Sequence, residues 1–325
     1  MPLLAAGIAF IVSLACIRLL LQRFGGAVLD RPNERSLHQH PVPRSGGIAI
    51  VAGIAFSAAF GAAELWRPLA LALALAGLSF VEDVRGVNTA LRLAGHVGAA
   101  VALVWLVAGS VPPMLLLVLV LAVAWLANLY NFMDGSDGLA GGMSVIGFSA
   151  YFIAAWLADD LAVASLCAST AAASAAFLLH NFHPARIFLG DVGSIPLGFL
   201  AGGIGVIGWR DGAWPIWFPL LVFAPFIGDA TLTLAKRAVR GEAVWRAHRE
   251  HYYQRLVRMG LGHAGTAWLY YGAMVLCAGA ALLARDRSFD VQAAVFAAAT
   301  LLLLAMAAWV DIRWTRFVRR SGAGA

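Results

Sequence analysis

The sequence predicts an all-α, polytopic integral membrane protein, a helical bundle of about eleven transmembrane helices with ten as the lower alternative. Of the 325 residues, 62% are hydrophobic and only 12% are charged, and the mean hydropathy is +0.82. A soluble domain carries about a quarter charged residues. A helix of about 20 apolar residues crosses the hydrocarbon layer of a membrane. A membrane β-barrel would need many alternating strands and turn signals, which are absent from the sequence.

Apolar runs along the chain mark the expected spans. The first run, Met1–Leu21, is followed by no clear small-residue cleavage signal, so it is interpreted as a retained span rather than a signal peptide. No internal repeat or low-complexity linker divides the chain, and residues 1–325 are expected to form one domain. The expected spans are 2–22, 46–63, 68–83, 91–108, 114–130, 139–157, 161–179, 195–208, 214–235, 264–284 and 291–310.

Basic residues are distributed unequally between the two sides of the bundle. Eighteen Lys and Arg residues lie near the span ends on one side, against four on the other. Because cytoplasmic loops of membrane proteins are rich in Lys and Arg, the first side is predicted to be cytoplasmic. The amino terminus is then outside and the carboxyl terminus inside. The same rule accounts for the net charge of +6 without a nucleic-acid partner.

Five polar segments fall on the predicted cytoplasmic side, with almost nothing comparable on the other. Any one of them is as well explained by a solvated loop. Together they indicate a functional site, because ionisable groups at membrane depth are costly. The five are DRPNERSLHQHPVPRSGG (30–47), VEDVRG (81–86), NFMDGSDG (131–138), HNFHPARIFLGDVGS (180–194) and RAHREHYYQRL (246–256).

The acidic residues of these segments are suited to phosphate chemistry. Asp83, Asp134, Asp137 and Asp191 offer hard oxygen ligands of the kind that hold Mg²⁺ together with substrate phosphates. The GDVGS stretch adds small residues and backbone N–H groups beside Asp191, which permits close approach by a phosphate. As an alternative, Asp134 or Asp137 could cap the helix expected over 139–157.

The basic residues of the last segment complete the pattern. His248 and His251, with Arg246, Arg249 and Arg255, form a basic cluster that could neutralise phosphoryl oxygens. A zinc site is the less favoured alternative, because the loop holds no cysteine or third histidine. Carboxylates, a metal and a basic clamp together favour phosphoryl transfer, in which positioning and charge neutralisation supply most of the catalysis.

These segments, in this order, resemble those of the polyprenyl-phosphate N-acetylhexosamine-1-phosphate transferase family, of glycosyltransferase family 4 type. The family includes the bacterial phospho-N-acetylmuramoyl-pentapeptide transferase and enzymes that start O-antigen chains. The resemblance runs from about Asp30 to Leu256, and the RAHREHYYQRL segment is most similar to the O-antigen-initiating subgroup. It implies a single transmembrane transferase domain with a cytoplasmic-face active site, in the bacterial inner membrane.

The resemblance also implies a reaction and its partners. A sugar 1-phosphate would pass from a UDP-N-acetylhexosamine to undecaprenyl phosphate, releasing UMP and starting a lipid-linked glycan such as O-antigen or another cell-envelope polysaccharide. Mg²⁺ is the implied cofactor, with Mn²⁺ as a substitute. The implied partners are the UDP-sugar donor, the undecaprenyl phosphate acceptor and membrane lipid. The sequence leaves open the sugar, the pathway and the oligomeric state, with a homodimer as one alternative.

Individual roles follow from the same resemblance. Glu82 and Asp83 match a motif in which the family usually has two aspartates. Arg44 or His38 takes the place of a lysine that some relatives carry in the first cytoplasmic loop. The implied catalytic residues are Glu82, Asp83, Asp191, His248 and His251; the implied metal ligands are Asp191 and Asn131; and the implied substrate-binding residues are His38, Arg44, Asn128, Asp134, Asp137, Asn181 and Phe188, the last by stacking on uracil.

Alternatives remain open for both mechanism and class. Direct attack by the acceptor is preferred to a covalent aspartyl-phosphate intermediate, because a phosphate monoester is already largely dianionic near neutral pH. An intramembrane Mg²⁺-dependent prenyltransferase would need two Asp-rich motifs, whereas the chain has one DxxD. A secondary transporter would place charges near the bilayer midplane, whereas here they gather on one face.

Overall fold

The computed structural model describes residues 1–23, 29–30, 37, 41–85, 88–244, 246 and 248–322. His38, one of the expected substrate-binding residues, lies outside this part of the chain. The elements in chain order are α1 (Pro2–Arg23), β1 (Leu29–Asp30), β2 (Val42–Pro43), α2 (Gly46–Ala58), η1 (Ala63–Leu65), α3 (Trp66–Arg85), α4 (Thr89–Ala108), α5 (Pro113–Met133), α6 (Leu139–Leu157), α7 (Leu161–Asn181), α8 (Asp191–Arg210), α9 (Phe218–Val222), α10 (Ala224–Val239), α11 (Tyr252–Leu256), η2 (Val257–Leu261), α12 (Gly262–Ala284) and α13 (Phe289–Ser321).

Nine helices in the described part of the chain are long and apolar enough to cross a membrane. The predicted polytopic helical membrane protein is therefore confirmed. Two of the eleven expected spans do not form a single helix of the predicted length. The span expected over 46–63 forms α2, which ends at Ala58, and the span expected over 214–235 is divided between α9 and α10. Pro225, in the first turn of α10, lacks the N–H that a continuous helix would need at this point.

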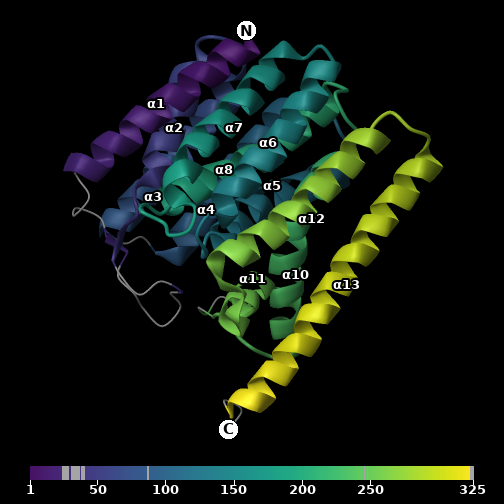
Figure 1. Ribbon diagram of the computed structural model, residues 1–325. Coiled ribbons are helices and arrows are strands. Elements are labelled where there is room, and N and C mark those ends of the chain that lie inside the picture. Colours follow the sequence, from purple (N-terminus) through teal and green to yellow (C-terminus); the bar gives the residue numbers. More distant parts are fainter. Residues whose placement is uncertain are drawn as a thin grey trace.

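The helix α8 lies at the centre of the bundle. In the most apolar 18-residue stretch of α8, 94% of the residues are buried; the corresponding share is 22% for α1 and 17% for α13. Helices α1 and α13 lie at the two flanks of the bundle (Figure 1). Glycines on α8 let its neighbours approach closely. A Cβ on Gly198 would lie 2.4 Å from the carbonyl oxygen of Leu126 on α5, and one on Gly202 would lie 2.9 Å from Val123 Cα. Small residues are the usual means by which membrane helices pack tightly.

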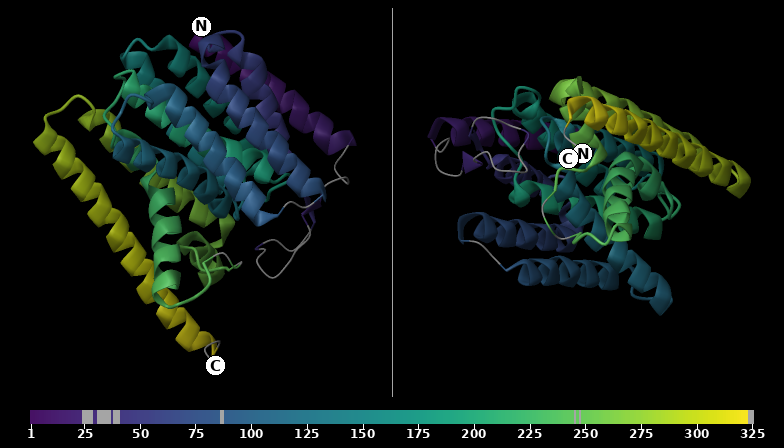
Figure 2. Two further views of the ribbon diagram at one scale, coloured as in Figure 1. Left: turned by 180° about the vertical axis from the view of Figure 1, so that it is seen from behind. Right: turned by 90° about the horizontal axis from the view of Figure 1, so that it is seen from below.

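The two ends of the chain lie at opposite ends of the bundle, as Figures 1 and 2 show. Long helices that follow one another alternate in direction. The ends of α3 and α5, the starts of α4, α8 and α12, and the short helix α11 therefore gather at the end of the bundle that carries the carboxyl terminus (Figure 1). The short β1–β2 pair, in which Leu29 faces Pro43, lies at the same end. The fold thus brings the described residues of all five polar segments to one face.

Candidate active site

Backbone hydrogen bonds join the segment before α2 to the loop before α8. Gly46 N donates to Phe188 O over 2.9 Å, and the ring of Phe188 is half-buried. Gly47 N donates to Leu189 O over 2.8 Å. A Cβ on Gly47 would lie 2.2 Å from the backbone nitrogen of Gly193, so only glycine permits this approach. These contacts hold the starts of α2 and α8 side by side.

Arg44 joins two of the predicted catalytic carboxylates. One guanidinium nitrogen donates to Asp191 Oδ1 at the start of α8, and the other lies 3.6 Å from Asp83 Oδ1 near the end of α3. Arg92, in the first turn of α4, forms a second bridge. Its Nη1 lies 2.6 Å from Glu82 Oε1 and 3.5 Å from Asp191 Oδ2. We call these five residues, from four separate segments, the carboxylate cluster.

Negative charge is in excess around Arg44. Burial acts to lower the pKa of Arg44, but Asp191, Asp83, Asp30 and Asp134 together raise it above its ordinary value. Burial raises the pKa of Asp134 well above its ordinary value; Arg44 opposes this shift and Asp191 adds to it. Crowded, partly buried carboxylates are costly unless cations compensate them. The site is therefore suited to binding additional positive charge.

The residues of this site fit the expected Mg²⁺. Glu82 Oε2 and Asp83 Oδ2 are buried without a hydrogen-bond partner in the described part of the chain, as expected for oxygens that serve a cation or a substrate. The described residues include no group of three or more His, Cys, Asp or Glu side chains that could hold a metal ion on their own. Mg²⁺ is commonly held by one or two carboxylates together with substrate phosphates. Asp191 and Asn131 could make such a contribution.

The end of α5 supplies three of the predicted site residues. Asn131 Nδ2 donates to Ser194 Oγ on α8 over 3.1 Å, which leaves the carboxamide oxygen for another partner. Asp134 ends α5 and is half-buried. Asn128 is engaged within the protein. Its oxygen pairs with His96 Nδ1 at 3.2 Å, and its nitrogen donates over 2.7 Å to a backbone carbonyl of its own helix. Asn128 thus links α4 to α5.

Asp137 and Asn181 join the α5–α6 loop to the α7–α8 loop. Asp137 Oδ2 lies 2.6 Å from His183 Nδ1. Asn181 is 3% exposed; it accepts from Gly138 N over 3.0 Å and donates to Ile187 O over 2.9 Å. Gly138, with a φ of 76°, is the residue that caps α6, so neither aspartate of the DGSDG stretch does so. Any contact of Asp137 or Asn181 with a nucleotide would be made in addition to these bonds.

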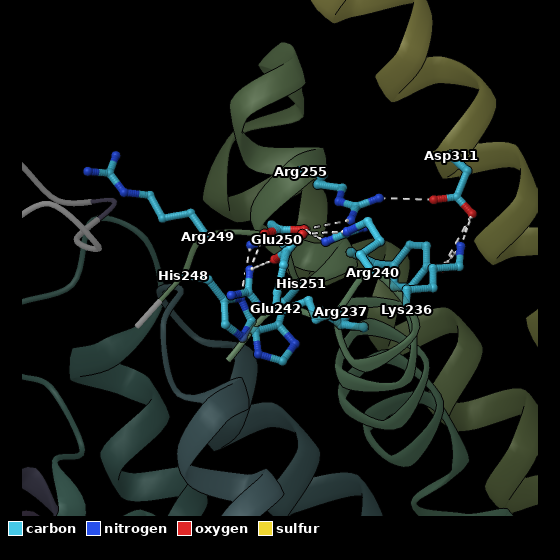
Figure 3. Close-up of polar contacts among 12 residues, drawn as sticks. Lys236, Arg237, Arg240, Glu242, His248, Arg249, Glu250, His251, Arg255 and Asp311 are labelled. Carbon is cyan, nitrogen blue, oxygen red and sulfur yellow. Dashed lines mark hydrogen bonds and ion pairs between the residues drawn. The ribbon is translucent and has the colours of Figure 1, made fainter. Parts of the chain in front are cut away.

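His248 and His251 lie side by side just before α11, with ring centroids 4.9 Å apart (Figure 3). Burial, with the added effect of His251 and Arg237, lowers the pKa of His248 to about 4, so this imidazole is neutral near pH 7. His251 Nδ1 lies 3.2 Å from Asp229 Oδ1, and its ring stacks on Phe132 with centroids 6.2 Å apart. The contact with Phe132 places His251 beside the end of α5.

The predicted basic cluster is only partly available to a substrate. Arg255 is buried, and its Nη1 lies 2.9 Å from Asp311 Oδ1 on α13. In the same network Glu250 pairs with Arg237, whereas Arg249 points away from it (Figure 3). Arg255 therefore holds α11 on α13. The sequence pattern had suggested that Arg255 clamps phosphates, but its guanidinium is already paired with Asp311.

Sequence patterns did not single out Arg92, His96 or Asp229. Arg92 and His96 are four residues apart on α4, which places both side chains on one face of the helix. This spacing of two basic residues at the start of an apolar span was the sequence signal that could have identified them as site residues. Asp229 is an acidic residue within the apolar segment expected as a span over 214–235, which is costly unless the residue has a function.

Comparison with known proteins connects this site to a family. Residues 65–208 match the family described as Glycosyl transferase family 4. The chain is 33% identical to a putative glycosyltransferase of Streptomyces coelicolor, over 92% of this chain and 76% of that protein. It is 29% identical to a probable undecaprenyl-phosphate N-acetylglucosaminyl 1-phosphate transferase of Bacillus subtilis, over 81% of this chain and 80% of that protein. It is 30% identical to a decaprenyl-phosphate N-acetylglucosaminephosphotransferase of Mycobacterium tuberculosis, over 78% of this chain and 74% of that protein.

These similarities confirm the predicted resemblance. They extend over most of the chain and so include the helices that carry the carboxylate cluster. The matched family region, 65–208, contains Glu82, Asp83, Arg92 and Asp191. The protein is a multi-pass helical membrane protein and belongs to the polyprenyl-phosphate N-acetylhexosamine-1-phosphate transferase family.

Proposed function

We propose that the protein transfers a sugar 1-phosphate from a UDP-N-acetylhexosamine to undecaprenyl phosphate, releasing UMP and starting a lipid-linked glycan. The observation that carries the proposal is the carboxylate cluster, in which Arg44 and Arg92 bridge Asp191 to Asp83 and Glu82. The setting is the cytoplasmic face of a bacterial inner membrane. The glycan is O-antigen or another cell-envelope polysaccharide.

The reaction exchanges one phosphorus–oxygen bond for another. An oxygen of the lipid phosphate attacks the phosphorus that carries the sugar, and the bond from that phosphorus to the bridging oxygen breaks. UMP leaves with the bridging oxygen, and a pyrophosphate links lipid and sugar. Because the acceptor is largely dianionic near neutral pH, it needs little activation by a base. Asp83, whose Oδ2 is buried without a partner among the described residues, orients the acceptor phosphate and takes up its last proton.

The arginines neutralise the phosphates that meet at the site. Guanidinium groups bind phosphoryl oxygens through paired N–H donors. Their carboxylate partners hold the Arg44 and Arg92 side chains in place before substrate binds. Mg²⁺, for which Mn²⁺ can substitute, would be held by Asp191 and Asn131 and would neutralise charge on the donor pyrophosphate.

Direct attack is the route that the ion pairs favour. Asp83 and Asp191 each lie against a guanidinium group, and an ion-paired carboxylate is a weaker nucleophile than a free one. The covalent alternative predicts a trapped intermediate. If the protein is incubated with a UDP-sugar labelled in the transferred phosphate, without acceptor lipid, and then denatured, we expect no label on the chain. Label that stays on the chain would establish the covalent route.

The test of the proposed function is a reconstituted reaction. The purified full-length protein is incubated with undecaprenyl phosphate and a panel of UDP-N-acetylhexosamines, including 6-deoxy derivatives. UMP release is measured and the lipid product is identified by mass. We expect UMP release only when acceptor lipid is present, and a product mass that identifies the sugar. Absence of UMP release with every donor would overturn the proposal.

A further inference from the structure

Asp229 is a buried carboxylate that gathers several hydrogen-bond donors. It lies on α10 and is 5% exposed. Its Oδ1 accepts from Tyr252 N over 2.9 Å and from Thr233 Oγ1 over 3.3 Å. Its Oδ2 accepts from Tyr253 N over 2.9 Å and from the hydroxyl of Tyr270 on α12. A buried carboxylate is tolerated when donors of this kind surround it.

The remaining partner of Asp229 is the imidazole of His251. His251 Nδ1 lies 3.2 Å from Asp229 Oδ1. Because an ionised carboxylate can only accept a hydrogen bond, this contact requires a proton on Nδ1. The backbone N–H of His251 donates to Gln254 Oε1 over 3.2 Å, which fixes the backbone that carries the ring. The His251 side chain also takes part in the capping box at the start of α11, toward the backbone N–H of Gln254. None of the side-chain hydrogen bonds in the described part of the chain uses His251 Nε2, so this nitrogen is the one that can serve a substrate.

The ring of His251 is docked against the end of α5. It stacks on Phe132, and the hydroxyl of Tyr253 donates to Phe132 O over 3.0 Å. The same hydroxyl would lie 2.1 Å from a Cβ on Gly135, so it lies against the backbone there. Gly135 follows Asp134, one of the predicted nucleotide-binding residues. The start of α11 is therefore fixed beside the loop that begins the DGSDG stretch.

We propose that Asp229 is a positioning residue, which holds His251 with the proton on Nδ1 and so presents Nε2 to the phosphates of the bound substrates. When Nε2 takes up a proton or a hydrogen bond from the substrate, the carboxylate stabilises the positive charge that develops on the imidazole. This inference rests on the proposed function, because it needs phosphates to be transferred beside His251. The competing explanation is that Asp229 only caps the start of α11, a role in which carboxylates are also favourable.

A double-mutant cycle separates the two explanations. UMP release is measured for the wild type, Asp229→Asn, His251→Ala and the double variant. Residues in direct contact are commonly coupled, and we expect Asp229→Asn to lower kcat/KM by about 3- to 100-fold in the wild type but to have little further effect once His251 is alanine. The matched controls are Thr233→Val and Tyr270→Phe. Each removes one bond to the same carboxylate without touching His251, and we expect each to lower kcat/KM less than Asp229→Asn does.

A spectroscopic measurement checks the tautomer without any turnover. In protein labelled with ¹⁵N-histidine, the His251 signals are assigned by their loss in His251→Ala. We expect a pyrrole-type signal for Nδ1 and a pyridine-type signal for Nε2 in the wild type, Thr233→Val and Tyr270→Phe. Asp229→Asn should shift both signals toward an averaged tautomer. If Asp229→Asn is not recovered as a folded protein, Asp229→Glu replaces it, because the extra methylene also displaces the carboxylate from Nδ1.

The possible outcomes are distinct. Equal losses from Asp229→Asn with and without His251 would show that Asp229 is only a helix cap. Unchanged His251 signals in Asp229→Asn, or full turnover of His251→Ala, would also overturn the inference while leaving the proposed function intact. Failure of the wild type to release UMP would instead overturn the proposed function.

Discussion

Arg44 donates a hydrogen bond to Asp191, although the two residues are 147 positions apart in the chain. The bond depends on the contact between the starts of α2 and α8, where Gly47 meets Gly193. It also links the polar segments 30–47 and 180–194, which are far apart in the sequence. The same guanidinium reaches Asp83 on α3, so one arginine organises carboxylates from two helices.

Asp191→Asn should lower turnover by about 100-fold or more, the usual scale for losing an electrostatic contact at the site of charge development. An amide cannot replace the carboxylate charge that holds a hard cation or pairs with Arg44. UMP release is the measurement, with the amount of membrane-extracted protein as a reference. The matched control is Asp286→Asn, an exposed acid near the start of α13 that should leave turnover unchanged. Near-normal turnover of Asp191→Asn would remove Asp191 from the site.

Glu82 and Asp83 should differ in importance. Adjacent helical residues point about 100° apart, and here Glu82 pairs with Arg92 whereas Asp83 faces Arg44. Asp83→Asn should reduce turnover by about 100-fold or more, the scale for a positioned proton-transfer group. Glu82→Gln should cost much less, because an amide oxygen can still accept from Arg92. Turnover is compared at saturating UDP-sugar and lipid phosphate from pH 6 to 9. An equal loss in the two variants would show that their roles are shared.

Gly47→Ala should impair both stability and activity. The added Cβ would lie 2.2 Å from the backbone of Gly193, which cannot move aside as a flexible side chain would. Overpacking of this kind costs about 1–3 kcal/mol, and it should separate Arg44 from Asp191. The thermal midpoint and UMP release are measured together. Gly77→Ala on α3 is the control, because nothing lies within 4 Å of its added Cβ. A Gly47→Ala variant as stable and active as Gly77→Ala would contradict the close contact.

Removal of divalent cations should abolish transfer. Treatment with EDTA leaves the excess of carboxylates around Arg44 uncompensated, and added Mg²⁺ or Mn²⁺ should restore UMP release. Asn131→Ala should raise the Mg²⁺ concentration needed for half-maximal rate, because an oxygen ligand is lost. Ser194→Ala is its control, since it removes only the partner of the Asn131 amide nitrogen. Full activity in the presence of excess chelator would rule out the metal.

The carboxyl terminus should lie in the cytoplasm. This topology rests on the excess of basic residues on one side of the bundle and on the position of the chain ends at opposite ends of it (Figure 1). A carboxyl-terminal reporter that is active only in the periplasm should therefore be silent, and one that is active only in the cytoplasm should work. Strong periplasmic activity would place the carboxylate cluster on the wrong face for the proposed reaction.

Composition and the long apolar runs were sufficient to predict a bundle of membrane helices. In lipid every backbone polar group must be satisfied within the protein, and a helix does this inside a single segment. Long apolar runs without the alternating pattern of barrel strands therefore form helices. The sequence also predicted the family, because the five polar segments between Asp30 and Leu256 occur in a specific order. The sequence did not determine every helix end. Local pattern did not show that α2 would end at Ala58 or that α10 would begin anew near Pro225.

Which polar side chains meet depends on how the helices pack, and the sequence did not predict it. Arg92 on α4 lies near Asp191, and Asp229 on α10 contacts His251. In each pair the two residues are distant in sequence. Arg255, predicted to be part of a phosphate clamp, instead forms an ion pair with Asp311 on α13. Periodicity and residue type reflect interactions over only a few residues along the chain. Ion pairs and hydrogen bonds between segments depend instead on how closely the helices pack, and that is set by contacts such as the one between Gly47 and Gly193.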